Sequence, residues 1–497
     1  MKLTAASVQL LLLLAAPSFG GGGSALLAES ARSGDLSAVT SLLAEGSDPS
    51  SAEPDGTTAL LWASYHDNHA MAEALLAAGT DPDAANRNGA TALGQACLNA
   101  SADMVRRLLA AGADAAKTVN GEPPLLTCAR SGSVEAVGRL LEASAEIDQP
   151  ESWRGQTALM WAAAEDHAAV VRLLLARGAN VTAQSESGWD ALAFAVRQEA
   201  RSSAALLIEA GADVNRPLPN GQSLLQMAIR NQHYSLAQAL LASSADPRAT
   251  DKGGRTALHD LIAAREPPRR RRAPEEIDPL DSIELLGSLL AHGADPNAAT
   301  PPGKRLSDEG TPSAIRPIID NAIRTGRSTP VLLAARAADV EAMRSLLDGG
   351  ADPTLVTAGG TSALMFAAGL VFVEGSRPFR SEADSLAAAR LAIELGLDAN
   401  AVNEHGQTAL HGAVYRASNE IISALVNAGA KPDLEDEHGR TPLDLAEQGF
   451  NQVSSIIRRE PAAELLRTFA GAIDADPQRR PTRALGFDRA QPEEISP

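Results

Sequence analysis

Two histidines stand close enough in the sequence to share a metal ion. His66 and His69 flank the middle of the stretch "YHDNH", a spacing that two metal ligands could use. No cysteine pair or acidic cluster accompanies them, so we predict no metal site. The sequence also shows no phosphate-binding loop, no nucleophile elbow and no metalloprotease motif. We therefore expect no cofactor, no small-molecule substrate and no enzymatic activity.

A short phrase, Gly-x-Thr/Ser-Ala/Pro-Leu, recurs through most of the chain. Its copies follow one another at intervals of 32 to 34 residues up to Gly254, and after that at 33 residues plus insertions. The stretch "STPVLLAA" at 328 fits the same frame if Arg327 takes the place of the glycine. A period this steady indicates repeated supersecondary units. The clear or degenerate copies begin at Gly56, Gly89, Gly121, Gly155, Gly188, Gly221, Gly254, Gly360, Gly406 and Gly439.

Each part of the repeat has a local structural role. The marker glycine allows a turn with positive φ. The following threonine, as in Thr408, caps a helix start, and Leu410 begins the buried face. A second helix follows, as in "AAVVRLLLARGAN" at 168–180, and Gly178 sits where a left-handed helix end is expected. The stretch that remains leaves room only for a hairpin-like finger.

These units are similar to ankyrin repeats. The family's Thr-Pro-Leu-His-x-Ala and Gly-Ala-Asp signatures recur over residues 25–460. The resemblance implies a mainly α fold, a solenoid of paired antiparallel helices with short β-hairpin-like fingers. We count about eleven repeats and a closing half-repeat from Gly439, and we expect residues 461–475 to form the C-terminal cap. His259 and His411 match the family's turn histidine and are interpreted as structural.

The two cysteines, Cys97 and Cys128, lie near equivalent places on the first helices of adjacent repeats. Stacked helices lie about 8–10 Å apart, whereas a disulfide requires Cα atoms about 4.4–6.8 Å apart. We therefore interpret them as two small buried thiols. A disulfide remains the alternative, because an oxidising compartment favours it.

Three insertions interrupt the regular period. Insertions in repeat arrays map to surface loops and often decorate a binding face. The first contains four consecutive arginines at 269–272 and the third contains Arg377 and Arg380, so the two could form a basic corner. Acidic residues directly follow the arginine run and could neutralise it, so a role in binding stays open. The insertions lie near residues 265–281, 298–327 and 370–384.

The two ends of the chain differ in composition from the repeats. Residues 1–20 combine Lys2, an apolar stretch from Val8 to Ala16 and small residues after Pro17, which predicts a secretory signal peptide. The stretch is short for a membrane span, although a retained anchor is the alternative. Arginine outnumbers lysine and alanine is abundant, which suggests a bacterium with a GC-rich genome. We thus expect a periplasmic or secreted protein, with a disordered tail at 476–497 that is rich in proline and charge.

The formal net charge of the chain is −19, from 43 basic and 62 acidic residues. Phosphate binding needs a basic face, so this charge argues against nucleic acid as the general partner. Aromatic residues make up only 3% of the chain, so alanine and leucine must do most of the packing. We expect a monomer whose partner is another protein.

The resemblance implies that contacts lie on the finger tips and on the exposed ends of the first helices. The place nine residues after the marker glycine holds four arginines and two of the three tyrosines, and finger places add tryptophans. Trp62 and Trp161 instead replace a semi-buried leucine and are interpreted as core. We predict that the concave face binds an acidic or carboxylate-bearing protein through Tyr65, Arg130, Trp153, Arg154, Trp189, Arg197, Arg230, Arg336 and Tyr415.

A second hypothesis belongs to a different class. The chain could be a structural or membrane-associated spacer of the envelope without a single dedicated partner. An evenly acidic surface would favour that hypothesis, whereas a basic concave stripe would favour the binder. Separately, the arginines of the row could pair with acidic finger residues and only keep the groove soluble. The sequence leaves both hypotheses open, because the repeat pattern encodes the scaffold and not the ligand.

Overall fold

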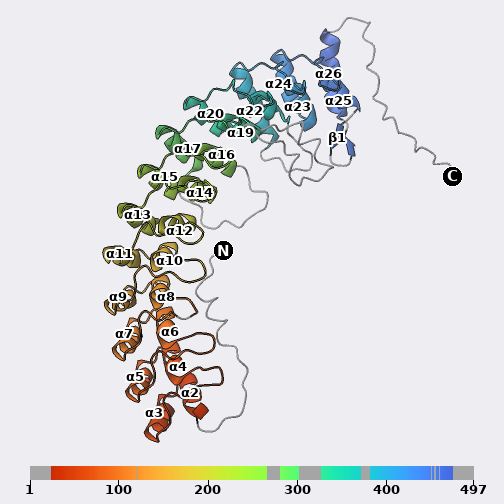
Figure 1. Ribbon diagram of the computed structural model, residues 1–497. Coiled ribbons are helices and arrows are strands. Elements are labelled where there is room, and N and C mark those ends of the chain that lie inside the picture. The colour runs from red at the N-terminus through yellow and green to blue at the C-terminus, as the bar shows by residue number, and fades with distance from the viewer. Residues whose placement is uncertain are drawn as a thin grey trace, which may run out of the picture. The chain divides into compact units, whose positions relative to one another are not determined.

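Short helices are nearly all of the regular secondary structure in the computed structural model (Figure 1). The structure describes residues 24–118, 120–265, 280–301, 326–370, 381–448, 450–452, 455–457 and 459–473. The chain divides into two compact units, Met1–Asp251 and Lys252–Pro497. The predicted signal peptide at 1–20, the predicted tail at 476–497 and the arginines of the insertions lie outside the described residues. None of the described helices is long and apolar enough to cross a membrane.

The first unit is a row of helix pairs. In each pair the two helices pack on each other, first helices stack on first helices, and from α3 to α13 second helices stack on second helices. The first helices are α2 (Ser24–Arg32), α4 (Ala59–Tyr65), α6 (Ala92–Leu98), α8 (Pro124–Ser131), α10 (Ala158–Ala164), α12 (Ala191–Gln198) and α14 (Leu224–Arg230). The second helices are α3 (Leu36–Ala44), α5 (His69–Ala77), α7 (Ala102–Ala110), α9 (Val134–Glu142), α11 (Ala168–Ala176), α13 (Arg201–Glu209) and α15 (Tyr234–Ala242).

The second unit repeats the arrangement across the insertions. Its first helices are α16 (Ala257–Ala264), α19 (Pro330–Arg336), α21 (Ala363–Ala368), α23 (Ala409–Arg416) and α25 (Pro442–Gln448). Its second helices are α17 (Ser282–Ala291), α20 (Val340–Asp348), α22 (Glu382–Glu394) and α24 (Asn419–Asn427). The short antiparallel strands β1 (Phe450–Gln452) and β2 (Ser455–Ile457) come next, and α26 (Glu460–Ile473) packs against α24 and α25. The closing unit therefore has a second helix, where the sequence count gave it only half a repeat.

Two of the three insertions fall between the helices of a pair, as the intervals predict, whereas the second lies between one pair and the next. The first separates α16 from α17, and the third separates α21 from α22. Part of the third insertion extends α22 to 13 residues, against nine in α20. A capping box explains where this longer helix begins, because Ser381 accepts the amide N–H of Asp384 while the Asp384 carboxylate accepts that of Ser381.

The repeat phrase forms the turn that the sequence predicts. Gly406 has φ of +70°, and a side chain there would lie 2.9 Å from the carbonyl oxygen of Glu435 in the next finger, so only glycine fits. Arg327 takes the marker's place with φ of 63°, and Gly178 ends its helix with φ of 89°. Both predictions are confirmed.

The fingers are turns more than hairpins. Within one finger, the amide of Asn86 donates to the carbonyl of Ala90 at 3.0 Å, and the amide of Arg87 donates to Asp55 of the preceding finger at 2.8 Å. In the described residues, finger strand pairing is limited to two isolated bridges, Ala52↔Thr58 and Ala85↔Thr91. A turn of so few residues has no length for a ladder, so hydrogen bonds between neighbouring fingers hold them in line.

Alanine at one place of the repeat lets neighbouring first helices approach closely. Ala162, Ala195 and Ala228 occupy this place in α10, α12 and α14, and each is fully buried. In α8 the same place is held by Cys128, and Cys97 of α6 faces it. The two sulfurs form a disulfide, with Cα atoms 4.4 Å apart.

The interpretation of two free thiols is therefore wrong. The spacing of about 8–10 Å between stacked helices refers to their axes. Since Cα atoms lie about 2.3 Å from an axis, facing Cα atoms come within about 4–5 Å of each other. Cys97 and Cys128 lie on facing sides of α6 and α8, within reach of a disulfide.

Buried histidines join successive repeats. His411 accepts the amide N–H of Thr408 at Nδ1, 3.0 Å away, and donates from Nε2 to the carbonyl of Arg440 in the next repeat, 3.1 Å away. His259 makes the same contacts with Thr256 and Ser328. Both side chains are fully buried, which agrees with a structural role.

Replacing His411 with glutamine should make the second unit less sensitive to acid. Burial lowers the pKa of His411. This effect outweighs the hydrogen bond to Arg440 and the charge of Asp436, both of which raise the pKa. Stability from the neutral ring is therefore present above the unfolded pKa of about 6.5 and is lost as the pH falls below it. Gln226 already fills this place in the first unit, where its Oε1 accepts the amide of Ser223.

Urea unfolding followed by circular dichroism at pH 7.5 and 5.5 measures this effect. The wild-type midpoint should fall more than that of His411→Gln between the two pH values. Equal falls in both proteins would contradict a lowered pKa at His411.

Candidate functional site

The last turns of the first helices carry the predicted binding residues. Tyr65, Arg130, Arg197 and Arg230 lie there in α4, α8, α12 and α14, and Tyr65 is 37% exposed. Because the first helices of the unit stack on one another, these side chains fall along one edge of it. Arg336 and Tyr415 occupy the same place in the second unit.

Two of these arginines have acidic partners. The Arg130 guanidinium lies 3.0 Å from the carboxylate of Glu122 and 5.1 Å above the ring of Trp161 in the next repeat. Arg230 lies 2.6 Å from Asp251. Glu122 and Asp251 belong to fingers, so both pairs match the alternative in which the arginines pair with acidic finger residues.

The two predicted residues of the second unit are less accessible. Arg336 is half-buried and has interaction partners of its own. Tyr415 is also half-buried, and its hydroxyl accepts a hydrogen bond from Gln407 Nε2 at 3.2 Å. Burial raises the pKa of Tyr415, beyond the opposing effect of Arg440. Little of this tyrosine is left for a partner.

The finger residues of the first unit are more exposed. Trp153 is 46% exposed, and the amides of Trp153 and Arg154 both donate to the carboxylate of Glu151, at 2.7 and 2.8 Å. The buried Glu151 thus fixes the turn and points Trp153 and Arg154 outward. Arg154 is exposed as well.

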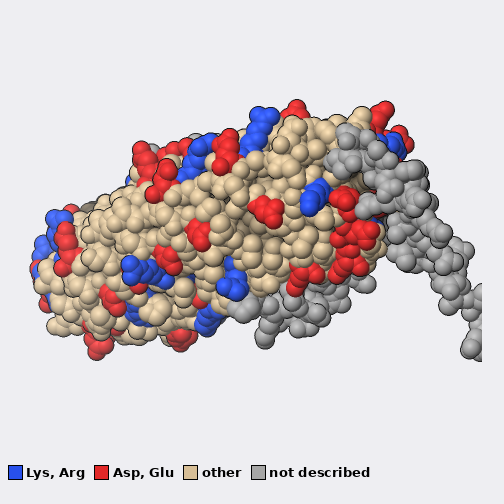
Figure 2. All heavy atoms as spheres, turned by 90° about the horizontal axis from the view of Figure 1, so that it is seen from above, with Lys and Arg blue, Asp and Glu red and all other residues tan. Residues whose placement is uncertain are grey.

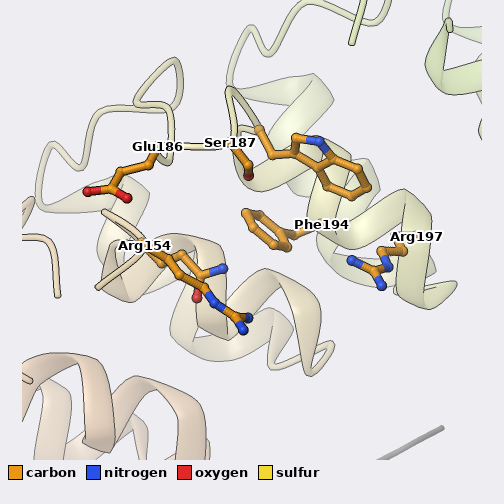
Figure 3. A pocket seen from close by; sticks show the side chains of 7 residues that line it. Arg154, Glu186, Ser187, Phe194 and Arg197 are labelled. Atoms are coloured by element: carbon orange, nitrogen blue, oxygen red, sulfur yellow. The ribbon is translucent and has the colours of Figure 1, made fainter. Parts of the chain in front are cut away.

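Trp189, Phe194 and Arg197 form a side-chain cluster on α12 and its finger. Figure 3 labels Phe194 and Arg197 of this cluster. The guanidinium of Arg197 lies 5.4 Å from the centroid of the Trp189 ring. Trp189 and Phe194 have ring centroids 5.6 Å apart, with their planes tilted by 54°. A cation stacked on an aromatic face keeps its N–H groups free for a ligand.

A cavity of about 540 Å³ opens beside this cluster. It joins side chains of two successive repeats, because Arg154 comes from the finger before α10 and Arg197 from α12. Figure 3 shows Arg154, Phe194 and Arg197 from these two sources in one view. The cavity is lined by Arg154, Gln156, Glu186, Ser187, Trp189, Phe194 and Arg197, and is called the Trp189 cavity below.

Sequence reasoning missed four of these lining residues. Phe194 carried a usable signal, because it takes the place in its repeat that Trp62 and Trp161 take in theirs. Gln156, Glu186 and Ser187 carried none, since glutamine, glutamate and serine are ordinary in a solvated turn.

The two tryptophans predicted to be core differ in burial. Trp62 is 7% exposed and donates from Nε1 to Glu53 at 3.1 Å, so its assignment to the core is confirmed. Trp161 is half-buried, and Arg130 stacks on the exposed part of its ring. Its assignment to the core is therefore wrong in part, since one face of the ring packs against Arg130.

The two neighbouring histidines already have protein partners. His66 Nε2 lies 2.8 Å from the carbonyl of Arg32, and His69 Nε2 lies 3.1 Å from the carboxylate of Asp67. Within the described ranges, no three side chains of His, Cys, Asp or Glu gather in a way that could hold a metal ion. On the face that Figure 2 shows, acidic and basic side chains are interspersed.

A family model described as "Ankyrin repeats (3 copies)" matches most of the chain. The matched residues are 27–119, 98–185, 125–217, 192–300 and 381–465.

Curated proteins match shorter stretches. Oxysterol-binding protein-related protein 1 of Mus musculus is 32% identical over 76 residues, which cover 15% of this chain and 8% of that protein. Ankyrin repeat and SOCS box protein 16 of Mus musculus is 32% identical over 206 residues, 39% of this chain and 41% of that protein. Palmitoyltransferase ZDHHC13 of Homo sapiens is 28% identical over 148 residues, which cover 25% of this chain and 24% of that protein. The matched stretch thus spans less than half the length of each relative.

Among solved structures, the human ASB11 ankyrin repeat domain is 30% identical to the chain. The match covers 44% of this chain and 96% of that domain, with a TM-score of 0.41.

Proposed function

Since the chain belongs to the ankyrin-repeat family, we propose that it is a non-enzymatic scaffold that binds another protein. Ankyrin repeats are generally protein–protein interaction modules. The surface that we assign to binding is the edge of the first unit formed by the fingers and the last turns of α4 to α14. The Trp189 cavity carries this assignment, because it brings exposed arginines from two repeats together beside the half-buried rings of Trp189 and Phe194.

The chemistry of this edge suits protein recognition. Tryptophan, tyrosine and arginine dominate the binding energy of most protein interfaces. Among the described residues of this edge, Trp153 and Tyr65 are the exposed aromatics, and Arg197 is held above Trp189 with no acidic partner. Preordered side chains lose little freedom on binding, which favours affinity.

We further propose that the protein works outside the cytosol, in the envelope of a bacterium or secreted from it. The disulfide between Cys97 and Cys128 supports this location, because disulfides persist in oxidising compartments and are rare in the cytosol. The leader at 1–20 supports it independently.

The spacer hypothesis keeps one observation in its favour. Arg130 and Arg230 are each paired with an acidic side chain of the same chain, so their charges are already compensated without a ligand. A spacer, however, has no need of the exposed Trp153, which costs solubility. The two hypotheses therefore differ in what Trp153 contacts in the cell.

A photo-cross-linker in place of Trp153 tests the proposed function. We expect p-benzoylphenylalanine at this position to form one saturable adduct with a partner in the producing cells. The same group at Arg177, an exposed residue at the end of α11, is the control. Adduct formation that is equal at both positions, or absent from both, would favour the spacer.

A further inference from the structure

We propose that the Trp189 cavity binds a carboxylate-bearing peptide segment, with Arg154 and Arg197 on the carboxylate and the rings of Trp189 and Phe194 against an apolar side chain beside it. This assignment rests on the proposed function, since it names the part of the partner that the scaffold recognises. Four observations of the cavity carry it.

The first is that its arginines have no acidic partner. Within the described part of the chain, neither Arg154 nor Arg197 lies within ion-pair distance of a carboxylate. Other arginines of the unit do, as in the pairs Arg130–Glu122, Arg216–Asp190 and Arg230–Asp251. Unpaired guanidinium groups offer parallel N–H donors that match the two oxygens of a carboxylate.

The second is the direction of the charged groups. In Figure 3 the carboxylate of Glu186 points away from the guanidinium groups of Arg154 and Arg197. Glu186 is tied to its finger through its backbone, whose amide donates to the carbonyl of Arg154 at 2.8 Å. The cavity therefore has a basic side that its own acid does not neutralise.

The third is an unsatisfied acceptor. Gln156 is only 7% exposed, and its Oε1 is buried without a hydrogen-bond partner. The glutamines at the same place in other repeats have one, because Asn220 donates to Gln222 and Asn403 donates to Gln407. The finger before α10 has Glu151 at the base of its turn, where the later finger has Asn403. A carboxylate cannot donate, so Gln156 lacks its partner.

The fourth is that the cavity combines these polar groups with an aromatic wall. A peptide segment supplies all the complementary chemistry at once: a carboxylate for the two arginines, a backbone N–H for Gln156, and an apolar side chain for the rings. In binding sites an apolar wall holds the ligand while a few well-placed polar groups fix its orientation.

Three fluorescein-labelled peptides test the inference on the whole protein by fluorescence anisotropy. The first is Gly-Phe-Asp-Gly with an amidated C-terminus, the second replaces its Asp with Asn, and the third has that Asn and a free C-terminal carboxylate. We expect the amidated Asn peptide to bind at least about tenfold more weakly than one or both of the others, since its peptide part has no carboxylate and all three share the same dye. Binding of the first peptide alone assigns the site to acidic side chains, and binding of the third alone assigns it to chain ends.

Paired variants show whether the binding uses this cavity. In Arg154→Ala/Arg197→Ala the affinity for the peptide that binds should fall by about tenfold or more. Arg172→Ala/Arg177→Ala removes the same charge from exposed positions on α11 and at its end, and should leave binding unchanged. Equal losses of affinity in both variants would show that the effect comes from the overall charge of the protein, and would overturn the inference.

The inference also fails if the three peptides bind alike, or if none binds at up to about 1 mM, where binding ceases to be useful. An adduct at position 153 together with such a failure would leave the proposed function standing and remove only the carboxylate site. If the peptides fail and the adduct at position 153 is also absent, both the carboxylate site and the proposed function are removed.

Discussion

Replacing Arg265 with methionine should lower the free energy of unfolding of the second unit by about 3–5 kcal/mol. Arg265 follows α16, and its side chain, 8% exposed, donates to both carboxylate oxygens of Asp339 at the start of α20, at 2.8 and 3.1 Å. Asp339 is 1% exposed. Removing one partner of a buried ion pair leaves the other charge without compensation, which accounts for a loss of this size.

The same arginine holds the ends of an insertion together. It also donates to the hydroxyl of Ser282, the first residue of α17, and to Glu341 in α20 at 3.0 Å. Burial lowers the pKa of Arg265, but the hydrogen bonds and the charge of Asp339 outweigh it, so the pKa is raised. Arg265 thus stays charged and ties the end of α16 to the starts of α17 and α20.

A second variant separates charge from packing. Asp339 caps α20 by accepting the amide of Ala342 at 3.2 Å, and asparagine keeps that bond. Arg265→Met/Asp339→Asn should therefore recover about half of the loss or more, because a buried pair replaced on both sides is often close to neutral. A double variant no more stable than Arg265→Met would contradict the charge explanation.

The two units can be followed separately in this experiment. All four tryptophans of the chain lie in the first unit, whereas both units contribute to circular dichroism. Arg265→Met should shift the unfolding transition seen by circular dichroism and leave that seen by tryptophan fluorescence in place.

Loss of the disulfide should destabilise the first unit by about 3–4 kcal/mol. Cys97 and Cys128 are 31 residues apart, and closing a loop of this length in the unfolded chain accounts for that amount. Both cysteines are fully buried, so reduction has to be carried out in the unfolded state before refolding. Urea unfolding followed by tryptophan fluorescence, with and without this reduction, measures the difference.

Cys97→Ala/Cys128→Ala provides the matched control. Alanine already fills the equivalent place of Cys128 in α10, α12 and α14, so the helices still approach closely. The variant should unfold like the reduced wild-type protein and should not respond to the reductant. An oxidised wild-type protein no more stable than this variant would show that the loop constraint contributes nothing.

The period of the sequence determined most of the fold. Each repeat builds its helices and turns from neighbours in the chain, so the glycine turns, the threonine caps and the histidine bonds follow from residues at fixed spacing. Gly178, Arg327 and His411 lie as the pattern predicts for this reason. The family followed from the same residues.

Only the tertiary structure decided how the side chains of different repeats pair. Arg130, Arg197 and Arg230 occupy one place of the repeat, yet Arg130 and Arg230 bind acids and Arg197 stacks on a tryptophan. A long flexible side chain takes the partner that the neighbouring finger happens to offer, and the period does not encode that choice.

The same holds for contacts across an insertion and between facing helices. Arg265 and Asp339 are separated by 74 residues, and Cys97 meets Cys128 because two helices face each other through small side chains. The sequence by itself thus determined the repeated scaffold, whose contacts are local. The tertiary structure decided the ion pairs, the disulfide and the Trp189 cavity, because each depends on where side chains from different repeats meet in space.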